Sequence, residues 1–215
     1  MVTSWPFDHL RPMGYGAILM DPPWSYKMYS EKGYAKSPEA HYATMRDGDI
    51  LDLPVGDLAQ RDCLLWLWGV YPKLDFAYDC VKHWGFKVVT GGVWLKRTVN
   101  GKNQWGPGYC LRTVAEPFIL ARNGDPQARL TNQPNAIGDW QLSTEEMGGG
   151  IIINALAREH SRKPPEARAI VERMTPRAFR CEIFGREPWI DGAGHSNDVW
   201  GNETGRFGQG GSGCD

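Results

Sequence analysis

Asp21, Pro22, Pro23 and Trp24 form the segment of this sequence whose residue types most clearly suggest chemistry. The Asp21 carboxylate and the Pro22 carbonyl are two hydrogen-bond acceptors, and the paired prolines hold the backbone between them in a rigid turn. Two fixed acceptors can bind the N–H groups of an exocyclic aromatic amine and direct its nitrogen lone pair toward a methyl donor. We therefore interpret these four residues as a candidate catalytic centre for methylation of an aromatic amine.

Trp24 gives this interpretation a second argument. An indole ring beside the turn can stack on a base, and its face attracts a positively charged sulfonium by ~0.5–2 kcal/mol. The alternative is that Asp-Pro-Pro is an ordinary turn, because aspartate and proline are common turn residues. The turn follows the short apolar run Ala17–Met20, which favours a strand that delivers the motif directly to a loop.

Strands and helices alternate along the rest of the chain. Apolar runs predict strands at Ala17–Met20, Cys63–Trp68, Phe86–Leu95 (interrupted by Gly91-Gly92), Glu116–Ala121 and Arg180–Phe184. Helical spacing predicts helices at Lys73–Trp84 and after Pro164-Pro165, whereas Ile151–Leu156 is ambiguous between strand and helix. This alternation favours a mostly parallel sheet with helices on its faces, whose ligand site lies beyond the carboxyl ends of the strands. The loops that contain Asp21 and Gly185 both follow a strand, so we expect them to share one site.

Composition indicates an ordinary soluble globular protein. The chain has 215 residues, a net charge of −1 and ten tryptophans, which is more tryptophan than usual. No apolar run approaches the ~20 residues of a membrane helix, and Met1–Leu10 lacks signal-peptide features, so we expect a cytoplasmic protein with no membrane association. The five cysteines and five histidines lack metal-ligand spacing, and we assign none of them to a metal. We expect one domain over residues 1–204 and a disordered glycine-rich tail over residues 205–215.

Several sequence blocks, in order, resemble the MT-A70 family of adenine-N6 methyltransferases. These blocks are Ile18–Trp24, His41–Met45 with Leu53–Val55, Leu65–Trp68, Trp84–Phe86 with Val93–Lys96, Arg158–Pro164, Glu182–Arg186 and Trp200–Glu203. The resemblance runs from about Phe7 to Glu203. The chain is similar to small bacterial or phage-like members of the family. This resemblance implies an α/β, Rossmann-like methyltransferase fold with permuted motif order and helices on both faces of the sheet.

The resemblance also implies a cofactor, S-adenosyl-L-methionine, and a set of residues that bind it. Asp21 and Lys163 would contact the cofactor, with Lys163 as the charge partner of its carboxylate. The remaining cofactor-binding candidates are Asp8, Ser161, Phe184, Gly185, Arg186, Asn202 and Glu203. We assign no role to residues 123–150.

The segment Lys87–Arg112 holds five basic residues and no acidic one, and Trp94, Trp105 and Tyr109 are interleaved with them. Such a mixture suits a phosphate backbone with unstacked bases, although a solvated basic face with core aromatics is an alternative. Substrate-binding candidates are Tyr26, Lys36, Lys96, Arg97, Lys102, Tyr109, Arg112 and Glu116. An adenine must be single-stranded or flipped out of a duplex to reach Asp21.

Three functions remain open on the sequence alone. The first is methylation of adenine N6 in DNA. We favour it because compact members of the family look bacterial or phage-like, and this favours DNA as the substrate. The second is the same reaction on RNA, and the third is a catalytically silent nucleic-acid-binding partner subunit. A cytosine-N4 enzyme is disfavoured because such enzymes usually carry serine where this chain has Asp21. A homodimer or a partner subunit is compatible with each of these functions.

Overall fold

The computed structural model describes residues 5–25, 44–106, 110–128, 130, 152–157, 162–202 and 204. Its strands are β1 (Tyr15–Met20), β2 (Ala59–Trp68), β3 (Lys87–Arg97), β4 (Ala115–Asn123), β5 (Ile152–Leu156), β6 (Arg180–Ile183), β7 (Trp189–Ile190) and β8 (Ser196–Trp200). Its helices are α2 (Asp47–Leu51), α3 (Val55–Leu58), α4 (Leu74–His83) and α5 (Pro165–Met174), with a 3-10 turn at Tyr71–Lys73. Within these residues, no helix is long and apolar enough to cross a membrane.

The strands form one sheet in the order β5-β3-β4-β2-β1-β6-β8-β7. β1 pairs in parallel with β2 and β6, β6 with β8, and β3 with β5, whereas β4 runs antiparallel to both β2 and β3. It follows that, among the described strands, only β4 and β7 run against the rest. The mostly parallel α/β sheet predicted from the sequence is therefore confirmed. The carboxyl ends of six strands and the amino end of β4 meet at one edge.

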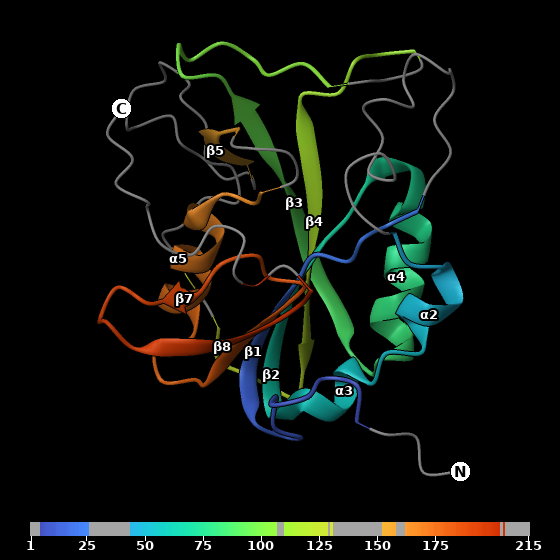
Figure 1. The fold of residues 1–215 in the computed structure, drawn as a ribbon, viewed down its shortest axis with the longest axis vertical. Coiled ribbons are helices and arrows are strands. Elements are labelled where there is room, and N and C mark those ends of the chain that lie inside the picture. The colour runs from blue at the N-terminus through green and yellow to red at the C-terminus, as the bar shows by residue number, and fades with distance from the viewer. Residues whose placement is uncertain are drawn as a thin grey trace.

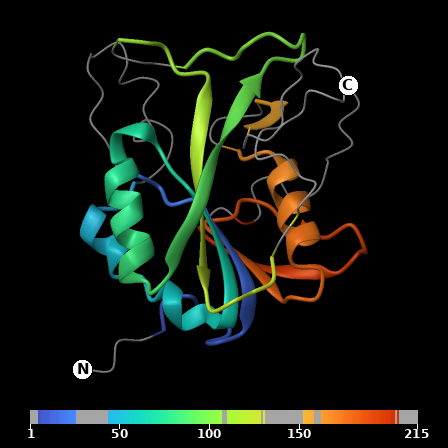
Figure 2. The same cartoon turned by 180° about the vertical axis from the view of Figure 1, so that it is seen from behind.

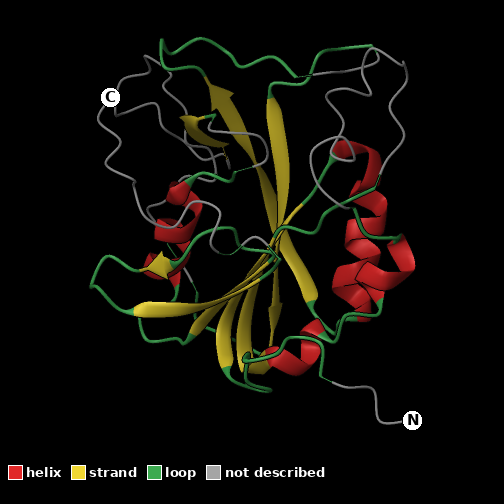
Figure 3. Ribbon diagram, in the orientation of Figure 1, coloured by secondary structure: helices red, strands yellow, loops and turns green. Residues whose placement is uncertain are grey.

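Helices cover both faces of this sheet, as Figures 1 and 3 show, with α2 and α4 on one side and α5 on the other. Figure 2 shows the same two layers from behind, with β3 and β4 crossing between them. Alternate residues of β2 divide between the two cores: Cys63, Leu65 and Leu67 pack on the α4 side, and Leu64, Trp66 and Trp68 pack on the α5 side. Because both faces are covered there, the strand is apolar from Cys63 to Trp68.

The two longer helices form where the apolar spacing predicts them. α4 buries Ala77, Cys80 and Val81 on one stripe, and α5 buries Ala167, Ile170 and Val171. α5 begins at Pro165, and a proline suits the first helical position because its missing N–H would have no intrahelical partner there.

The prediction of an interrupted strand at Gly91-Gly92 is wrong, because β3 runs without a break through both glycines. A Cβ on Gly91 would lie 2.8 Å from the carbonyl oxygen of Phe118 in β4, so glycine permits close approach of the two strands. The ambiguous Ile151–Leu156 segment is a strand, β5, which pairs with β3.

Candidate active site

The Asp21–Trp24 loop leaves β1 at the carboxyl edge of the sheet, and its backbone is fixed by several hydrogen bonds. The Asp21 N–H donates to the Ile183 carbonyl at 3.3 Å, the Trp24 N–H donates to the Pro22 carbonyl at 2.8 Å, and the Met45 N–H donates to the Pro23 carbonyl at 3.0 Å. The loop is therefore held to β6 and to the chain before α2. A carbonyl oxygen has two lone pairs, so Pro22 can accept a second hydrogen bond.

Trp24 lies in the core beside this loop. It is only 3% exposed, and its ring meets Phe76 of α4 edge-on, with 6.1 Å between ring centroids. Its indole N–H donates to the Trp68 carbonyl at 3.1 Å, which joins the loop to the end of β2. The interpretation of Trp24 as a stacking surface for a base is therefore corrected, because packing against Phe76 and the core leaves little of the residue exposed. In this structure Trp24 holds the loop in place.

Asp21 is paired with Lys163, which lies just before α5. Lys163 Nζ donates to Asp21 Oδ2 at 2.7 Å, and the two side chains are only 13% and 15% exposed. Lys163 Nζ also lies 5.6 Å from the centroid of the Trp68 ring. Both side chains line a pocket at the carboxyl edge of the sheet. Its other lining residues are Leu19, Trp68, Arg162, Pro164, Pro165, Ala167, Arg168, Glu182, Phe184, Arg186 and Glu187.

A second carboxylate, Glu116, shares Lys163 with Asp21. Glu116 Oε2 lies 3.4 Å from Lys163 Nζ, and Glu116 Oε1 accepts a hydrogen bond from Lys96. The short chain Lys96–Glu116–Lys163–Asp21 thus alternates in charge from β3 across the start of β4 to the motif loop. Because β4 is antiparallel, its amino end brings Glu116 to the same edge as the carboxyl ends of β1 and β3.

The two carboxylates have pKa values shifted in opposite directions. Burial alone would raise the pKa of Glu116, but the two lysines beside it lower that pKa from 4.5 to about 2. Burial raises the pKa of Asp21 above its ordinary value of 3.8, and the attraction of Lys163 only partly opposes this. The repulsion of Glu116 adds to the upward shift of Asp21. Of the two carboxylates, Asp21 is therefore the one that becomes protonated at the higher pH.

The cofactor-binding candidates from the end of the chain lie around the same pocket. Phe184 and Arg186 line it, and Arg186 favours the charged form of Asp21. The Gly185 N–H donates to the Trp200 carbonyl at 3.1 Å, and a Cβ on Gly201 would lie 3.0 Å from the Gly185 carbonyl. The strand-end segments after β6 and β8 therefore run side by side. This places the exposed Asn202 near Gly185, although Asn202 is not among the pocket's lining residues.

Asp8 is not brought into the pocket. Its side chain is 89% exposed on a turn before β1, and it lies 3.9 Å from His9. Five other candidates (Tyr26, Lys36, Tyr109, Ser161 and Glu203) lie outside the residues that the structure describes. Their roles stay predictions.

The substrate-side candidates divide into two groups. Lys96 and Glu116 are part of the site, at 27% and 21% side-chain exposure. Arg97, Lys102 and Arg112 belong to the end of β3 and the connection to β4, which Figure 1 shows beyond the carboxyl edge of the sheet. Trp94 is 2% exposed and belongs to the core on the α5 side, whereas Trp105 is 54% exposed.

Sequence reasoning assigned no role to a second charged cluster in the pocket wall. Arg168 of α5 donates to Glu182 of β6 at 2.8 Å, and Arg162 pairs with Glu187. Burial raises the pKa of Glu182 above 4.5, and Arg168 opposes that shift. Glu182 and Arg162 fall within the blocks that carry the family resemblance, which is the one signal that marks them in the sequence.

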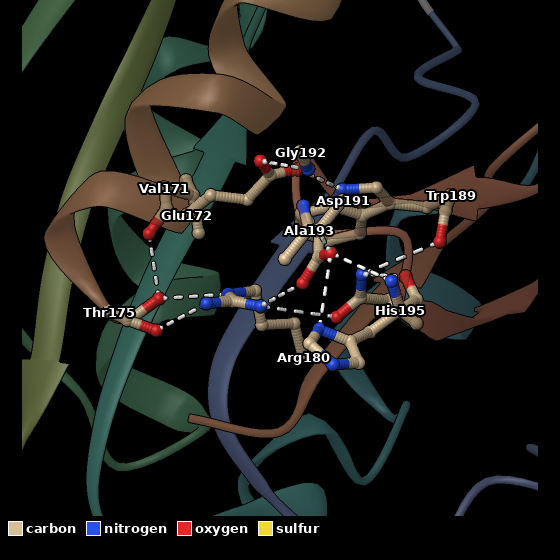
Figure 4. Close-up of polar contacts among 10 residues, drawn as sticks. Val171, Glu172, Thr175, Arg180, Trp189, Asp191, Gly192, Ala193 and His195 are labelled. Atoms are coloured by element: carbon tan, nitrogen blue, oxygen red, sulfur yellow. Dashed lines mark hydrogen bonds and ion pairs between the residues drawn. The ribbon is translucent and has the colours of Figure 1, made fainter. Parts of the chain in front are cut away.

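Sequence reasoning also missed the β7–β8 hairpin, which separates Arg186 from Asn202. Arg180, at the start of β6, donates to the Thr175 carbonyl at 2.6 Å and lies 3.3 Å from Asp191 Oδ2 (Figure 4). The Trp189 indole N–H donates to Glu172 of α5 at 2.7 Å. These contacts fix the hairpin to α5 and β6, and so fix the spacing of the pocket segments on either side of it.

The chain is similar to known proteins over most of its length. The MT-A70 family model matches residues 15–203. An Arabidopsis thaliana N(6)-adenosine-methyltransferase MT-A70-like protein is 29% identical over 174 residues, which cover 80% of this chain and 22% of the relative. The Homo sapiens N(6)-adenosine-methyltransferase catalytic subunit METTL3 is 26% identical over 176 residues, covering 80% of this chain and 26% of the relative.

The Mus musculus N(6)-adenine-specific methyltransferase METTL4 is 23% identical over 203 residues, which cover 90% of this chain and 38% of that relative. The chain thus spans between 22% and 38% of the length of these three curated relatives. The region matched by the family model contains β1, the Asp21 loop, Glu116, Lys163 and the strand ends that surround the pocket. With most of its length inside that match, the chain belongs to the MT-A70 family.

Proposed function

We propose that this protein transfers a methyl group from S-adenosylmethionine to the N6 amine of adenine in DNA. The observation that carries the proposal is the buried pair of Asp21 and Lys163, whose charged atoms lie 2.7 Å apart in the pocket at the carboxyl edge of the sheet. S-adenosylmethionine is the cofactor of the family's methyltransferases.

The charges of the pocket fit that cofactor. Its methionine part carries a carboxylate and an ammonium group, which need a cation and an anion close together. Lys163 can bind the carboxylate, and Asp21 can accept a hydrogen bond from the ammonium group. Phe184, at the pocket wall, can cover the flat adenine or the sulfonium. When bound, the cofactor would supply an electrophilic methyl group on sulfur.

The protein would act on the target amine through hydrogen bonding. In the described contacts Asp21 uses Oδ2 for Lys163, so Oδ1 remains an acceptor for one N–H of the amine. The Pro22 carbonyl would accept from the other N–H with its second lone pair. The two acceptors withdraw the lone pair from the ring system and aim it at the methyl donor, and the fixed loop makes this arrangement in advance. The proton released after transfer can leave to water.

RNA is the second candidate substrate, and the names of the relatives favour it. The Arabidopsis and human relatives are named for adenosine, the ribonucleoside. The mouse METTL4 relative is named for adenine, which DNA and RNA share, and its match covers more of this chain. A third possibility is a silent subunit, since the human relative is named as a catalytic subunit. The intact Asp21–Lys163 pair is evidence against silence.

One experiment separates these functions. The purified protein is incubated with S-adenosylmethionine and matched DNA and RNA oligonucleotides that contain a single adenine, and the products are digested and analysed by mass spectrometry. The proposal expects N6-methyladenine in the DNA and none when purine, which lacks the amine, replaces adenine. Methylation of RNA alone would move the assignment to RNA. Calorimetry with S-adenosylmethionine completes the test, because a folded protein that neither binds it nor methylates either oligonucleotide is a silent subunit.

A further inference from the structure

The connection between β3 and β4 holds one tryptophan in an unusual position. Trp105 is 54% exposed, whereas Trp66, Trp68 and Trp94 on the adjoining strands are each 2% exposed or less. The Arg112 guanidinium lies 5.4 Å from the centroid of the Trp105 ring, and Arg112 Nε donates to the Gly106 carbonyl at 3.3 Å. The ring therefore has a cation against one side and solvent on much of the rest.

The backbone that carries Trp105 is fixed by hydrogen bonds. The chain turns at Gly101, whose φ is +71°, and the Thr98 N–H donates to the Lys102 carbonyl at 2.8 Å. On either side of Trp105, the Gln104 N–H donates to the Lys96 carbonyl at 2.8 Å and the Gly106 N–H donates to the Thr113 carbonyl at 2.7 Å. A ring on such a backbone is pre-positioned, so binding a ligand costs little ordering entropy.

The same backbone links Trp105 to the candidate active site. Lys96 accepts from Gln104 through its carbonyl, donates its N–H to the Val114 carbonyl at 2.9 Å, and pairs with Glu116 through its side chain. Glu116 in turn lies beside Lys163. Trp105 is therefore attached to the rim of the site rather than to a remote surface.

Charge identifies the kind of partner that this surface fits. Lys87 lies at the far end of β3, but from Lys96 to Ala115 the sequence still contains four basic residues and no acidic one. Arg97 and Lys102 flank the turn at Gly101 that leads to Trp105, and Arg112 lies against the Trp105 ring. Protein interfaces usually mix both signs of charge, whereas a one-signed basic surface with an exposed aromatic ring suits a phosphate backbone and an unstacked base.

We infer that Trp105, backed by Arg112, is a stacking platform for a nucleobase that neighbours the target adenine in single-stranded nucleic acid. The inference rests on the proposed function for the identity of the target. In a duplex, the neighbouring base is already stacked on both sides and is unavailable to the ring. The platform therefore makes the protein prefer single strands. Its binding depends on the presence of a neighbouring base and not on which base it is.

The test measures binding by fluorescence anisotropy, without a methyl donor, so that it does not depend on catalysis. Trp105→Ala and Trp105→Phe are compared with wild type on a labelled single-stranded DNA, on the same DNA with an abasic site beside the adenine, and on the duplex. Removal of one stacked base corresponds to about 5- to 150-fold in affinity. Trp105→Ala is expected to weaken single-strand binding within that range, and Trp105→Phe is expected to weaken it less.

The abasic DNA gives the decisive comparison. If Trp105 stacks on the neighbouring base, the abasic site weakens binding to wild type but adds nothing to the weakened binding of Trp105→Ala. If the two changes instead weaken binding independently, the platform is overturned. The same conclusion follows if Trp105→Ala binds the single strand as wild type does, or if wild type binds the duplex as tightly as the single strand.

The chain offers a matched control. Phe179 is 63% exposed with the Arg11 guanidinium 5.5 Å from its ring centroid, and it lies just before β6, at the opposite edge of the sheet. Phe179→Ala should leave oligonucleotide binding and activity as in wild type. Analytical sedimentation tests whether a second copy of this chain, rather than nucleic acid, contacts Trp105. If Trp105→Ala dissociates an oligomer and leaves DNA binding unchanged, the surface is a contact between copies and the inference fails.

Failure of the inference is distinct from failure of the proposed function. If wild type binds single strands through Trp105 but methylates neither DNA nor RNA, the platform is supported and the methyltransferase assignment is wrong. If wild type methylates adenine but Trp105→Ala binds single strands normally, the methyltransferase assignment is supported and the platform is wrong.

Discussion

Lys163 Nζ donates a 2.7 Å hydrogen bond to Asp21 Oδ2 between residues that lie 142 positions apart in the chain. The contact joins the loop after β1 to the start of α5, across the carboxyl edge of the sheet. Because a buried charge needs a partner, each of the two residues depends on the other for its protonation state and position. The methyl acceptor and the cofactor would therefore meet at a single ion pair.

Asp21→Asn should abolish most of the activity while the fold survives. The amide keeps the shape of the side chain, but it can present an N–H where the reaction needs a second acceptor. Loss of one such preorganised group reduces kcat by about 10²- to 10³-fold. Methyl incorporation into oligonucleotides measures the effect, and circular dichroism checks the fold. Asp79→Asn, an exposed change on α4, serves as the control, and a folded Asp21→Asn protein with full activity would contradict the mechanism.

Lys163→Met should reduce both stability and cofactor binding. The change leaves the Asp21 carboxylate buried without its closest cation, which costs about 3 kcal/mol in the free energy of unfolding. Urea denaturation measures this cost, and calorimetry measures the affinity for S-adenosylmethionine. The double variant Asp21→Asn/Lys163→Met should lose less stability than the two single losses added together. Strict additivity would mean that the pair is not coupled, and Lys82→Met, at an exposed pair, is the reference for a harmless lysine change.

The pH dependence of activity should follow Asp21. The reaction needs the ionised carboxylate, and burial raises its pKa above 3.8, so activity falls as the pH falls through that raised value. Glu116 adds to the upward shift by repulsion. Glu116→Gln should therefore move the acid limb of kcat/KM to lower pH, whatever happens to the height of the profile. An unmoved limb, or one moved to higher pH, would show that Asp21 does not control it.

Glu116 should affect the pH dependence of stability in the usual carboxylate direction. Its pKa is lowered from 4.5 to about 2 by Lys163 and Lys96, so its ionised form stabilises the native state above the unfolded pKa. That stabilisation is lost as the pH falls from about 4.5 toward 2. The difference in unfolding free energy between wild type and Glu116→Gln should shrink over this interval. A difference that is independent of pH would mean that the carboxylate is not held by the two lysines.

The long elements of the fold were predictable because they bury apolar residues in a regular pattern. Cys63–Trp68 and Leu74–His83 show this clearly, since a strand covered on both faces is apolar throughout and a helix covered on one face repeats every three or four residues. The β7–β8 hairpin was missed because its strands are short and carry polar residues. Trp189 and Ile190 alone give no period to detect.

Topology predicted only that the Asp21 and Gly185 loops share one site, because both follow a strand at the carboxyl edge of the sheet. Lys163 was marked by the family resemblance alone, as a partner of the cofactor's carboxylate, and its hydrogen bond to Asp21 is seen only in the structure. Lys96 and Glu116 were expected only on the substrate side, and their link to Lys163 depends on β4 being antiparallel, which no local pattern reveals. Trp24 was misinterpreted for a different reason. Chemistry allows an indole to stack or to pack, and only the position of Phe76 decides between them.

Arg180 provides a test of how the hairpin supports the pocket. Its guanidinium is buried against Thr175 and Asp191, and the residue is 6% exposed. Arg180→Leu removes the cation and leaves carbonyl and carboxylate acceptors without a donor, which costs about 3–5 kcal/mol in the free energy of unfolding. The change should also weaken binding of S-adenosylmethionine, because the hairpin sets the spacing between Arg186 and Asn202.

His195→Ala is a control within the same network, because it removes a side chain beside Asp191 but no hydrogen bond that fixes the hairpin. The His195 backbone N–H donates to Asp191 at 2.8 Å and its exposed ring lies 3.4 Å from the same carboxylate. Loss of the ring keeps the backbone hydrogen bond, so this variant should fold and bind the cofactor nearly as wild type does. Arg177→Leu, an exposed change outside the network, is the control for Arg180→Leu. If a folded Arg180→Leu protein binds S-adenosylmethionine as tightly as Arg177→Leu does, then the hairpin does not position the pocket, and its contacts with α5 serve stability alone.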